Sequence, residues 1–251
     1  MSRLIPGCAM IFFSLIAMAS SDEVRFETRD RVAVFGDLYM SPGGRSGPII
    51  LLFHQAGGDA QGEYTEIARR LVESGYNVLA IDQRSGGDRF GGTNRKVRAL
   101  DGEEYGYCDV YPDLEAALDF VRADGFDGPL AIWGSSYSAA LVFQLGAKRS
   151  EEVSAILAFS PASGAPLADC DVQQYVKDLS VPALALRPSK EYEIDSVKDQ
   201  MGRFKDSGIR TYVSDPGVHG SSMLVEARVG DSTQPTWTVV LDFLRETMRA
   251  N

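Results

Sequence analysis

The sequence predicts an α/β fold with a mostly parallel central sheet and helices on both faces. Short continuous apolar runs, which are typical of strands buried on both faces, recur at 49–53, 76–81 and 130–133. Segments whose apolar residues recur at helical spacing separate these runs. Strands that alternate with helices in this way form parallel sheets with right-handed crossovers.

The first half of the chain divides at turn residues. A β-prone stretch from Val24 to Met40 is interrupted by Arg29-Asp30-Arg31, which indicates an opening pair of strands. After the buried strand at 49–53, a helix that ends before Gly75 is expected, because its apolar residues share one face: Tyr64, Ile67, Ala68, Leu71 and Val72. A second buried strand is expected at 76–81.

The second half continues the alternation of strands and helices. A helix is expected at 111–123, where Leu114, Ala117, Leu118 and Val121 form an apolar face. The same signals predict strands at 153–159, 181–186 and 209–214, and helices at 195–204 and 237–248. Two long connections, 82–108 and 160–171, remain, and loops of such length in a compact domain are more often functional than accidental.

The segment from Leu130 to Ala147 carries the motif around which the chain is organised. An apolar run is followed by Gly134-Ser135-Ser136-Tyr137-Ser138 and then by apolar residues at helical spacing, which predicts a strand, a sharp turn and a helix. The five residues are one substitution from the G-x-S-x-G nucleophile elbow, which exposes a serine hydroxyl above the sheet. The motif has a small residue two positions before the serine and another two positions after it. Gly134 fits the first position, and Ser138 departs from the glycine of the second. We predict Ser136 as a nucleophile, although an ordinary small-residue turn fits the same letters.

The N-terminus has the three parts of a secretory signal peptide. Arg3 precedes an apolar run at 11–16, and Ala17-Met18-Ala19 fits an A-x-A-like cleavage site. The apolar run is short for a membrane span. We expect a signal peptide at 1–19, a single mature domain at 20–251, and a secreted or periplasmic location without membrane attachment after cleavage. An uncleaved N-terminal anchor is the alternative.

Length and charge limit the classes of function. About 230 residues remain after the leader, which suits one sizeable domain. The net charge of -10, without a basic cluster, argues against nucleic acid and anionic membrane surfaces as partners. The chain has two histidines, at separate places, and no paired-cysteine motif, so no metal is expected. No nucleotide-binding glycine motif is completed, and no cofactor is expected.

Two cysteines lie beyond the leader, Cys108 and Cys170. Both fall in loops that follow strands on the same edge of the predicted sheet. A disulfide and two separate thiols are both compatible with the sequence, because the distance between the two residues is not encoded in it.

From about Phe35 to the C-terminal helix, the chain resembles α/β-hydrolases of the dienelactone-hydrolase-like type. In that family the nucleophile, the acid and the histidine follow one another along the chain, with the acid after one late strand and the histidine after the next. Ser136, an acidic cluster after 181–186 and His219 after 209–214 have this order. The resemblance implies that His219 takes the proton of Ser136 and later returns it to the leaving group.

The acidic cluster contains three candidates for the residue that orients His219. Glu191 stands at the position where the family usually has an aspartate, with Glu193 and Asp195 nearby. We choose Glu191, since the fold accepts either acid. A solvated helix N-terminus is the alternative explanation of this cluster, because acidic residues are favoured there.

The segment His54-Gln55-Ala56-Gly57-Gly58 corresponds to the H-G segment of the family, with glutamine in place of glycine. The resemblance implies that the backbone N–H of Ala56, or of Gln55, joins that of Tyr137 in an oxyanion hole. Because these donors are backbone groups, the substitution is compatible with such a hole.

The resemblance implies a serine hydrolase that acts on a small-molecule carboxylic ester through a Ser-His-Glu triad and an acyl-enzyme, and the leader pattern adds the expectation that this hydrolase is exported. The same machinery serves a small exported peptidase or an acyltransferase. A catalytically silent protein of this fold that binds a ligand or a partner is the other alternative. The connections 85–108 and 160–171 are candidates for specificity, and Tyr105, Tyr107 and Tyr111 either line a pocket or cover the core.

Overall fold

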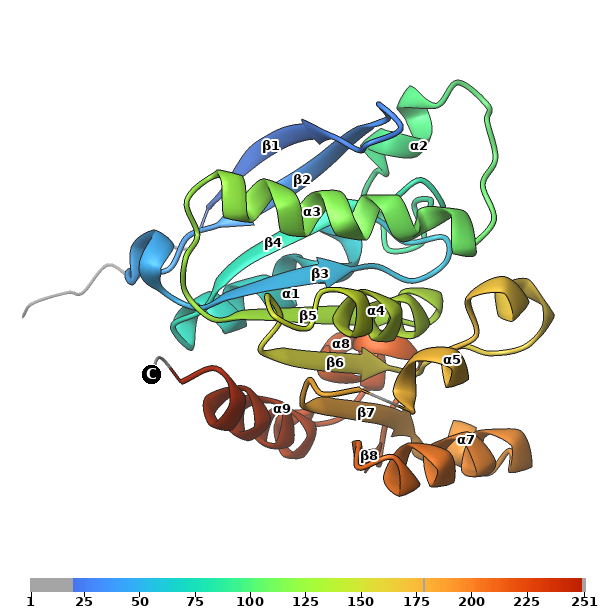
Figure 1. Ribbon diagram of the computed structural model, residues 1–251. Helices are drawn as coiled ribbons and strands as arrows, with labels where there is room; N and C mark the ends of the chain where they lie inside the picture. The colour runs from blue at the N-terminus through green and yellow to red at the C-terminus, as the bar shows by residue number, and fades with distance from the viewer. Residues whose placement is uncertain (1–19, 178, 250–251) are drawn as a thin grey trace, which may run out of the picture.

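The computed structural model describes residues 20–177 and 179–249, so the predicted signal peptide at 1–19 lies outside the described residues. A central sheet runs through the molecule, with helices on both sides (Figure 1). The strands are β1 (Ser21–Glu27), β2 (Ala33–Tyr39), β3 (Ile49–Phe53), β4 (Asn77–Asp82), β5 (Leu130–Ser135), β6 (Ala155–Phe159), β7 (Ala183–Pro188) and β8 (Arg210–Ser214).

The longer helices lie where the apolar periodicity predicts them, and four short helices of the described residues were not predicted. The helices are α1 (Ala60–Glu73), α2 (Arg95–Ala99), α3 (Tyr111–Ala123), α4 (Tyr137–Lys148), α5 (Gln173–Val176), α6 (Ser189–Tyr192), α7 (Asp195–Asp206), α8 (Glu226–Val229) and α9 (Gln234–Thr247). Short 3-10 helices are η1 (Gly44–Ser46), η2 (Cys108–Val110), η3 (Ala165–Cys170) and η4 (Gly220–Leu224). The unpredicted helices that bear on the site are α2 and α6.

The eight strands of the described residues follow the spatial order β1-β2-β4-β3-β5-β6-β7-β8. The strands from β4 through β8 in this order are parallel, whereas β1 and β2 form an antiparallel edge. Parallel strands bring their carboxyl ends to one edge of the sheet, where α/β proteins place their ligands. The expected mostly parallel sheet is thereby confirmed, and the segments that follow β3, β5, β7 and β8 meet at this edge.

Alternate residues of the central strands face opposite layers of the core. In β3, Ile49, Leu51 and Phe53 pack into the layer covered by α3, α4 and α7, while Ile50 and Leu52 pack into the layer covered by α1 and α9. All five side chains have no exposed surface. The burial of both faces explains why these strands are continuous apolar runs. Within the described residues, no helix combines the length and the apolar character needed to cross a membrane.

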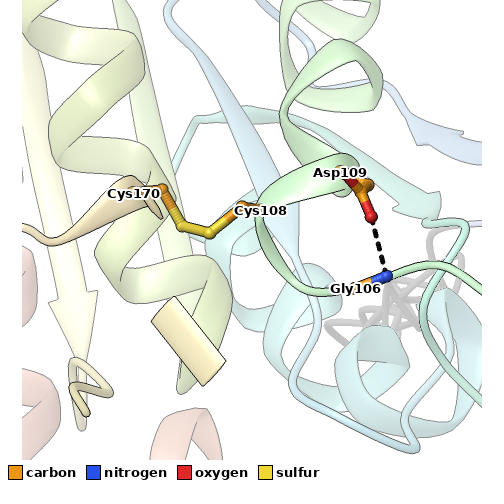
Figure 2. Close-up of a disulfide and its surroundings, with 4 residues drawn as sticks. All are labelled: Gly106, Cys108, Asp109 and Cys170. Carbon is orange, nitrogen blue, oxygen red and sulfur yellow. Dashed lines mark hydrogen bonds between the residues drawn. A yellow bond between two sulfur atoms is a disulfide. The ribbon is translucent and has the colours of Figure 1, made fainter. Parts of the chain in front are cut away.

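A disulfide joins the two long connections. Cys108, in η2, is bonded to Cys170, at the end of η3, with their Cα atoms 5.6 Å apart (Figure 2). Beside it, the backbone N–H of Gly106 donates to the Asp109 carboxylate at 2.9 Å and closes the turn that leads into η2. Of the two alternatives that the sequence left open, the structure has the disulfide.

Replacing Cys108 with serine is expected to lower the free energy of unfolding by about 2–4 kcal/mol, because a crosslink between residues 62 positions apart restricts the unfolded chain. Chemical denaturation of the oxidised wild type, the single variant and the Cys108→Ser/Cys170→Ser double variant measures this change. The double variant should be no less stable than the single one. A loss below about 1 kcal/mol would show that the crosslink contributes little.

Candidate active site

Ser136 lies at a strained turn between β5 and α4. Its backbone has φ 59° and ψ -116°, in the left-handed region that L-residues rarely adopt. The turn directs the serine away from the strand, and the side chain is half-buried. A strained strand-to-helix turn at this serine is the geometry of the predicted nucleophile elbow.

The two small residues around Ser136 have different reasons to be small. A Cβ on Gly134 would lie 2.3 Å from the backbone oxygen of Ser138, so α4 passes β5 too closely for any side chain there. Ser138, which departs from the family pattern, uses its hydroxyl. It donates to the carbonyl of His54 at 2.7 Å and accepts from Gln83 Nε2 at 2.8 Å. The Ser138 hydroxyl, which glycine would lack, therefore connects the elbow to the loops that follow β3 and β4.

His219 and Glu191 are joined directly. His219 follows β8 and Glu191 lies on α6 after β7, and His219 Nδ1 is 2.5 Å from Glu191 Oε1. Nδ1 therefore carries the proton toward the carboxylate, which leaves Nε2 as the proton acceptor. The other two candidate acids are both exposed, and Asp195 is paired with Lys198 at 3.3 Å.

Arg187 holds Glu191 from the other side. Its guanidinium donates to Glu191 Oε2 at 2.7 Å and to Gln200 Oε1 at 2.7 Å, and it also bonds the carbonyl of Pro161. Burial raises the pKa of Glu191, but the hydrogen bonds from His219 and Arg187 outweigh it and bring the pKa down to about 2. Glu191 is therefore ionised at neutral pH and keeps one oxygen for His219.

Residues adjacent to Ser136 and His219 are in contact. The N–H of Ser221 donates to Ser135 Oγ at 3.0 Å, and a Cβ on Gly220 would lie 2.3 Å from the same oxygen. Among the residues that the structure describes, no hydrogen bond joins the hydroxyl of Ser136 to His219.

The backbone donors predicted for an oxyanion hole differ in their surroundings. The N–H of Gln55 donates to Glu63 Oε2 at 2.9 Å and is thus directed into the protein. The N–H groups of Ala56 and Tyr137 have no acceptor among residues 20–177 and 179–249. Of the two alternatives in this loop, the geometry therefore favours Ala56.

His54 is a buried anchor of the same loop. Its Nδ1 lies 2.9 Å from the carbonyl of Gln55, and its Nε2 accepts the N–H of Gln83 at 3.0 Å. Burial lowers the pKa of His54, so the ring is neutral with its proton on Nδ1. The contacts connect the loop after β3 to the loop after β4.

Two cavities flank this edge of the sheet. One, of about 530 Å³, is lined in part by Ser85, Tyr105 and Tyr107. Tyr107 stacks on Tyr137 with ring centroids 4.6 Å apart, and Tyr137 donates its hydroxyl to the carbonyl of Ser85 at 2.7 Å. The other cavity, of about 290 Å³, includes His219 and Gln55 in its wall. Across the described part of the chain, no three His, Cys, Asp or Glu side chains are grouped so as to hold a metal ion.

The sequence model of the serine aminopeptidase S33 family, Hydrolase_4, matches residues 45–228. This span is most of the chain and contains Ser136, Glu191 and His219. The chain belongs to the S33 family. No curated protein sequence matches it.

Solved structures share the fold of this S33 family member over nearly its whole length. An esterase from Pyrococcus furiosus has a TM-score of 0.70 at 18% identity, covering 97% of this chain and 99% of that one. A putative dienelactone hydrolase from Klebsiella pneumoniae has a TM-score of 0.67 at 16% identity, covering 90% and 98%. An acylaminoacyl peptidase from Pyrococcus horikoshii has a TM-score of 0.68 at 16% identity, covering 94% of this chain and 43% of that one. The predicted α/β-hydrolase fold is confirmed.

Arg187 is a site residue of this S33 protein that the sequence reasoning missed. It stands four residues before Glu191, and the two form an i, i+4 pair across the end of β7. Basic and acidic residues at this spacing are common on solvated helices, so the signal was present but not specific. In the sequence, Ser138 is visible only as a departure from the motif, because its two hydrogen bonds involve residues distant in sequence.

The ion pair of Glu191 in this S33 protein predicts a pH dependence of stability. The folded pKa of about 2 lies below the ordinary value of 4.5, so the stabilisation is complete above about pH 4.5 and is lost as the pH falls toward 2. Between pH 5 and pH 3 the wild type is expected to lose about 1–2 kcal/mol more unfolding free energy than Glu191→Gln. Urea denaturation at several pH values measures this difference. Glu193→Gln should lose as much unfolding free energy as the wild type. An equal dependence of unfolding free energy on pH in all three proteins would contradict the stabilising role of the Glu191 ion pair.

Proposed function

We propose that this protein is an exported serine hydrolase that cleaves small carboxylic esters through an acyl-enzyme on Ser136. The observation that carries the proposal is the hydrogen bond between Glu191 and His219, 2.5 Å long, beside a serine held on a strained elbow. A binding protein of the same fold has no need for all three residues in this order. The same pair of observations argues against the catalytically silent alternative.

The proposed reaction follows from the position of each proton. Glu191 accepts from His219 Nδ1, which leaves Nε2 to take the proton of the Ser136 hydroxyl as its oxygen attacks the ester carbonyl. The N–H groups of Ala56 and Tyr137 bind the oxyanion that forms, and donors of this kind are each worth about 10²–10³ in rate. The imidazolium then gives its proton to the leaving alcohol. Water repeats the sequence on the acyl-enzyme and frees Ser136.

Peptide hydrolysis is a second candidate, favoured by the family's description as serine aminopeptidases. An aminopeptidase must bind the α-ammonium group of its substrate, which a carboxylate does well. Glu103 and Glu104 are exposed carboxylates in the wall of the larger cavity. Comparing p-nitrophenyl acetate with leucine p-nitroanilide separates the two candidates, since the first tests esterase activity and the second aminopeptidase activity.

Export is supported by two independent features. The leader pattern at 1–19 is that of a secretory signal peptide. The disulfide between Cys108 and Cys170 is of a kind that persists in oxidising compartments and is rare in the cytosol. We therefore propose a secreted or periplasmic location.

A fluorophosphonate probe tests the proposed nucleophile without knowledge of the substrate, because it reacts with activated serines. Wild-type protein is expected to be labelled, and Ser136→Ala is expected to lose all labelling and all hydrolysis of p-nitrophenyl acetate. Circular dichroism of both proteins confirms that they are folded. Folded wild type that resists the probe would refute the proposed function.

Removing the charge of Glu191 should lower turnover more than changing its acidic neighbours. Glu191→Gln is expected to reduce kcat for p-nitrophenyl acetate by at least about 10²-fold, because the imidazolium loses its partner and the ring loses its fixed tautomer. The matched controls Glu193→Gln and Asp195→Asn are expected to stay within about two-fold of the wild type, since both side chains are exposed. Similar losses in all three variants would dismiss Glu191 as the acid.

A further inference from the structure

Glu63 is a buried carboxylate that the proposed reaction does not use. It lies in the first turn of α1, and its side chain has no exposed surface. Oε2 accepts the backbone N–H of Gln55 at 2.9 Å, whereas Oε1 has no hydrogen-bond partner among the described residues. Burying a carboxylate with incomplete partners costs several kcal/mol, so this position is unfavourable for stability alone.

The loop after β3 is shaped around this carboxylate. A Cβ on Gly58 would lie 2.8 Å from Glu63 Oε2 and 3.1 Å from the carbonyl of Gln55, so a side chain at this position would require the Glu63 carboxylate or the loop to shift. The N–H of Gly58 donates to that same carbonyl at 3.0 Å. Three further contacts hold this turn, because His54 Nδ1 lies 2.9 Å from the Gln55 carbonyl and the carbonyls of Gly57 and Gly58 accept from the N–H groups of Arg89 and Gly87. Among the bonds of residues 55–58, the one to Glu63 is the bond that fixes the direction of the Gln55 N–H.

The charges around Glu63 come from the segments that form the site. Burial raises the pKa of Glu63 to about 7, and the Gln55 N–H and the positive charge of Arg228 oppose this rise. Ser135 and His219 also lie close enough to influence the pKa of Glu63. Burial, with a smaller contribution from the charge of Glu63, raises the pKa of the Tyr64 and Tyr137 phenols. The ionisation of Glu63 therefore changes near neutral pH, which gives it a spectroscopic signature.

We propose that Glu63 is the positioning residue of the oxyanion loop: by accepting the N–H of Gln55, it turns this peptide inward and leaves the next N–H, that of Ala56, directed at the reacting carbonyl. Glu63 does not touch the substrate and acts through the loop. This inference rests on the proposed ester hydrolysis at Ser136. It adds to the predicted triad a residue that positions the loop after β3.

Steady-state kinetics with p-nitrophenyl acetate test the inference through the difference between kcat and KM. Glu63→Leu removes the acceptor at similar size and is expected to lower kcat at least ten-fold with KM within three-fold, because an oxyanion donor acts mainly in the transition state. Glu63→Gln keeps an acceptor for the Gln55 N–H and should stay within three-fold of the wild type. Glu66→Leu, an exposed glutamate of the same helix, is the matched control. Unchanged kcat in Glu63→Leu, or an equal loss in Glu63→Gln, overturns the inference.

A second variant disturbs the same contact while it leaves Glu63 in place. Gly58→Ala introduces the Cβ that would lie 2.8 Å from Oε2, and it is expected to reproduce the loss of kcat with little change in KM. If Glu63→Leu shows no cooperative unfolding transition, Gly58→Ala decides the kinetic test. Wild-type kcat in folded Gly58→Ala overturns the inference.

A measurement independent of activity separates failure of this inference from failure of the proposed function. In ¹H–¹⁵N spectra recorded from pH 5 to pH 9, the Gln55 amide should shift with a midpoint near the pKa of Glu63, about 7. The shift should persist in Ser136→Ala and disappear in Glu63→Gln. A constant Gln55 amide, or one that still titrates in Glu63→Gln, overturns the anchoring role. If wild type neither hydrolyses the ester nor reacts with the fluorophosphonate, the proposed function fails, and this titration alone decides the anchoring role.

Discussion

The strained backbone of Ser136 is the constraint on which the site depends. A positive φ at a non-glycine residue costs about 1–3 kcal/mol and persists only where the surroundings hold it. The neighbouring strand β6 and the loop after it hold the backbone of Ser136 in place. The N–H of Ser136 donates to the carbonyl of Phe159 at 2.8 Å, and the carbonyl of Ser136 accepts the N–H of Ala162 at 3.0 Å. The close passage of α4 at Gly134 closes the turn from the other side. The elbow is thus a product of the sheet and not of the motif alone.

The same arrangement recurs one strand along the sheet. Ser160, at the end of β6, also has a positive φ of 51°, and its N–H donates to Leu186 at 2.8 Å. Its hydroxyl accepts the N–H of Gly220 at 3.0 Å, immediately after His219. These bonds link the ends of β5, β6 and β7. The loop that carries His219 is attached to the same strand ends through the bond between Gly220 and Ser160. The spacing of the site residues therefore follows from the register of the parallel strands.

Buried charges order the connection between β4 and α3, which lines the larger cavity. Asp113 on α3 accepts from Arg84 at 2.7 Å and from Lys96 at 2.9 Å, and all three side chains are almost completely buried. Buried charges are tolerated when they are paired and hydrogen-bonded, and breaking such a group leaves an uncompensated charge. The connection contains the five-residue helix α2, which is too short to show an apolar periodicity and forms on these tertiary contacts. The sequence left the crosslink from Cys108 to Cys170 open, because tertiary contacts set the distance between the two cysteines.

The sequence by itself determined the order of the strands and the longer helices, the strand-turn-helix segment around Ser136, and the order of Ser136, the acidic cluster and His219, because apolar runs, helical periodicity and turn residues are local signals. Only the tertiary structure decided which acid faces His219. Glu191, Glu193 and Asp195 all follow β7 closely and carry the same chemical group, and they differ only in direction once α6 and the loop after β8 are packed together. Nδ1 of His219 lies 2.5 Å from Glu191 Oε1, while the other two carboxylates are exposed. Direction in space depends on which segments meet at the sheet edge, and no local pattern contains that information.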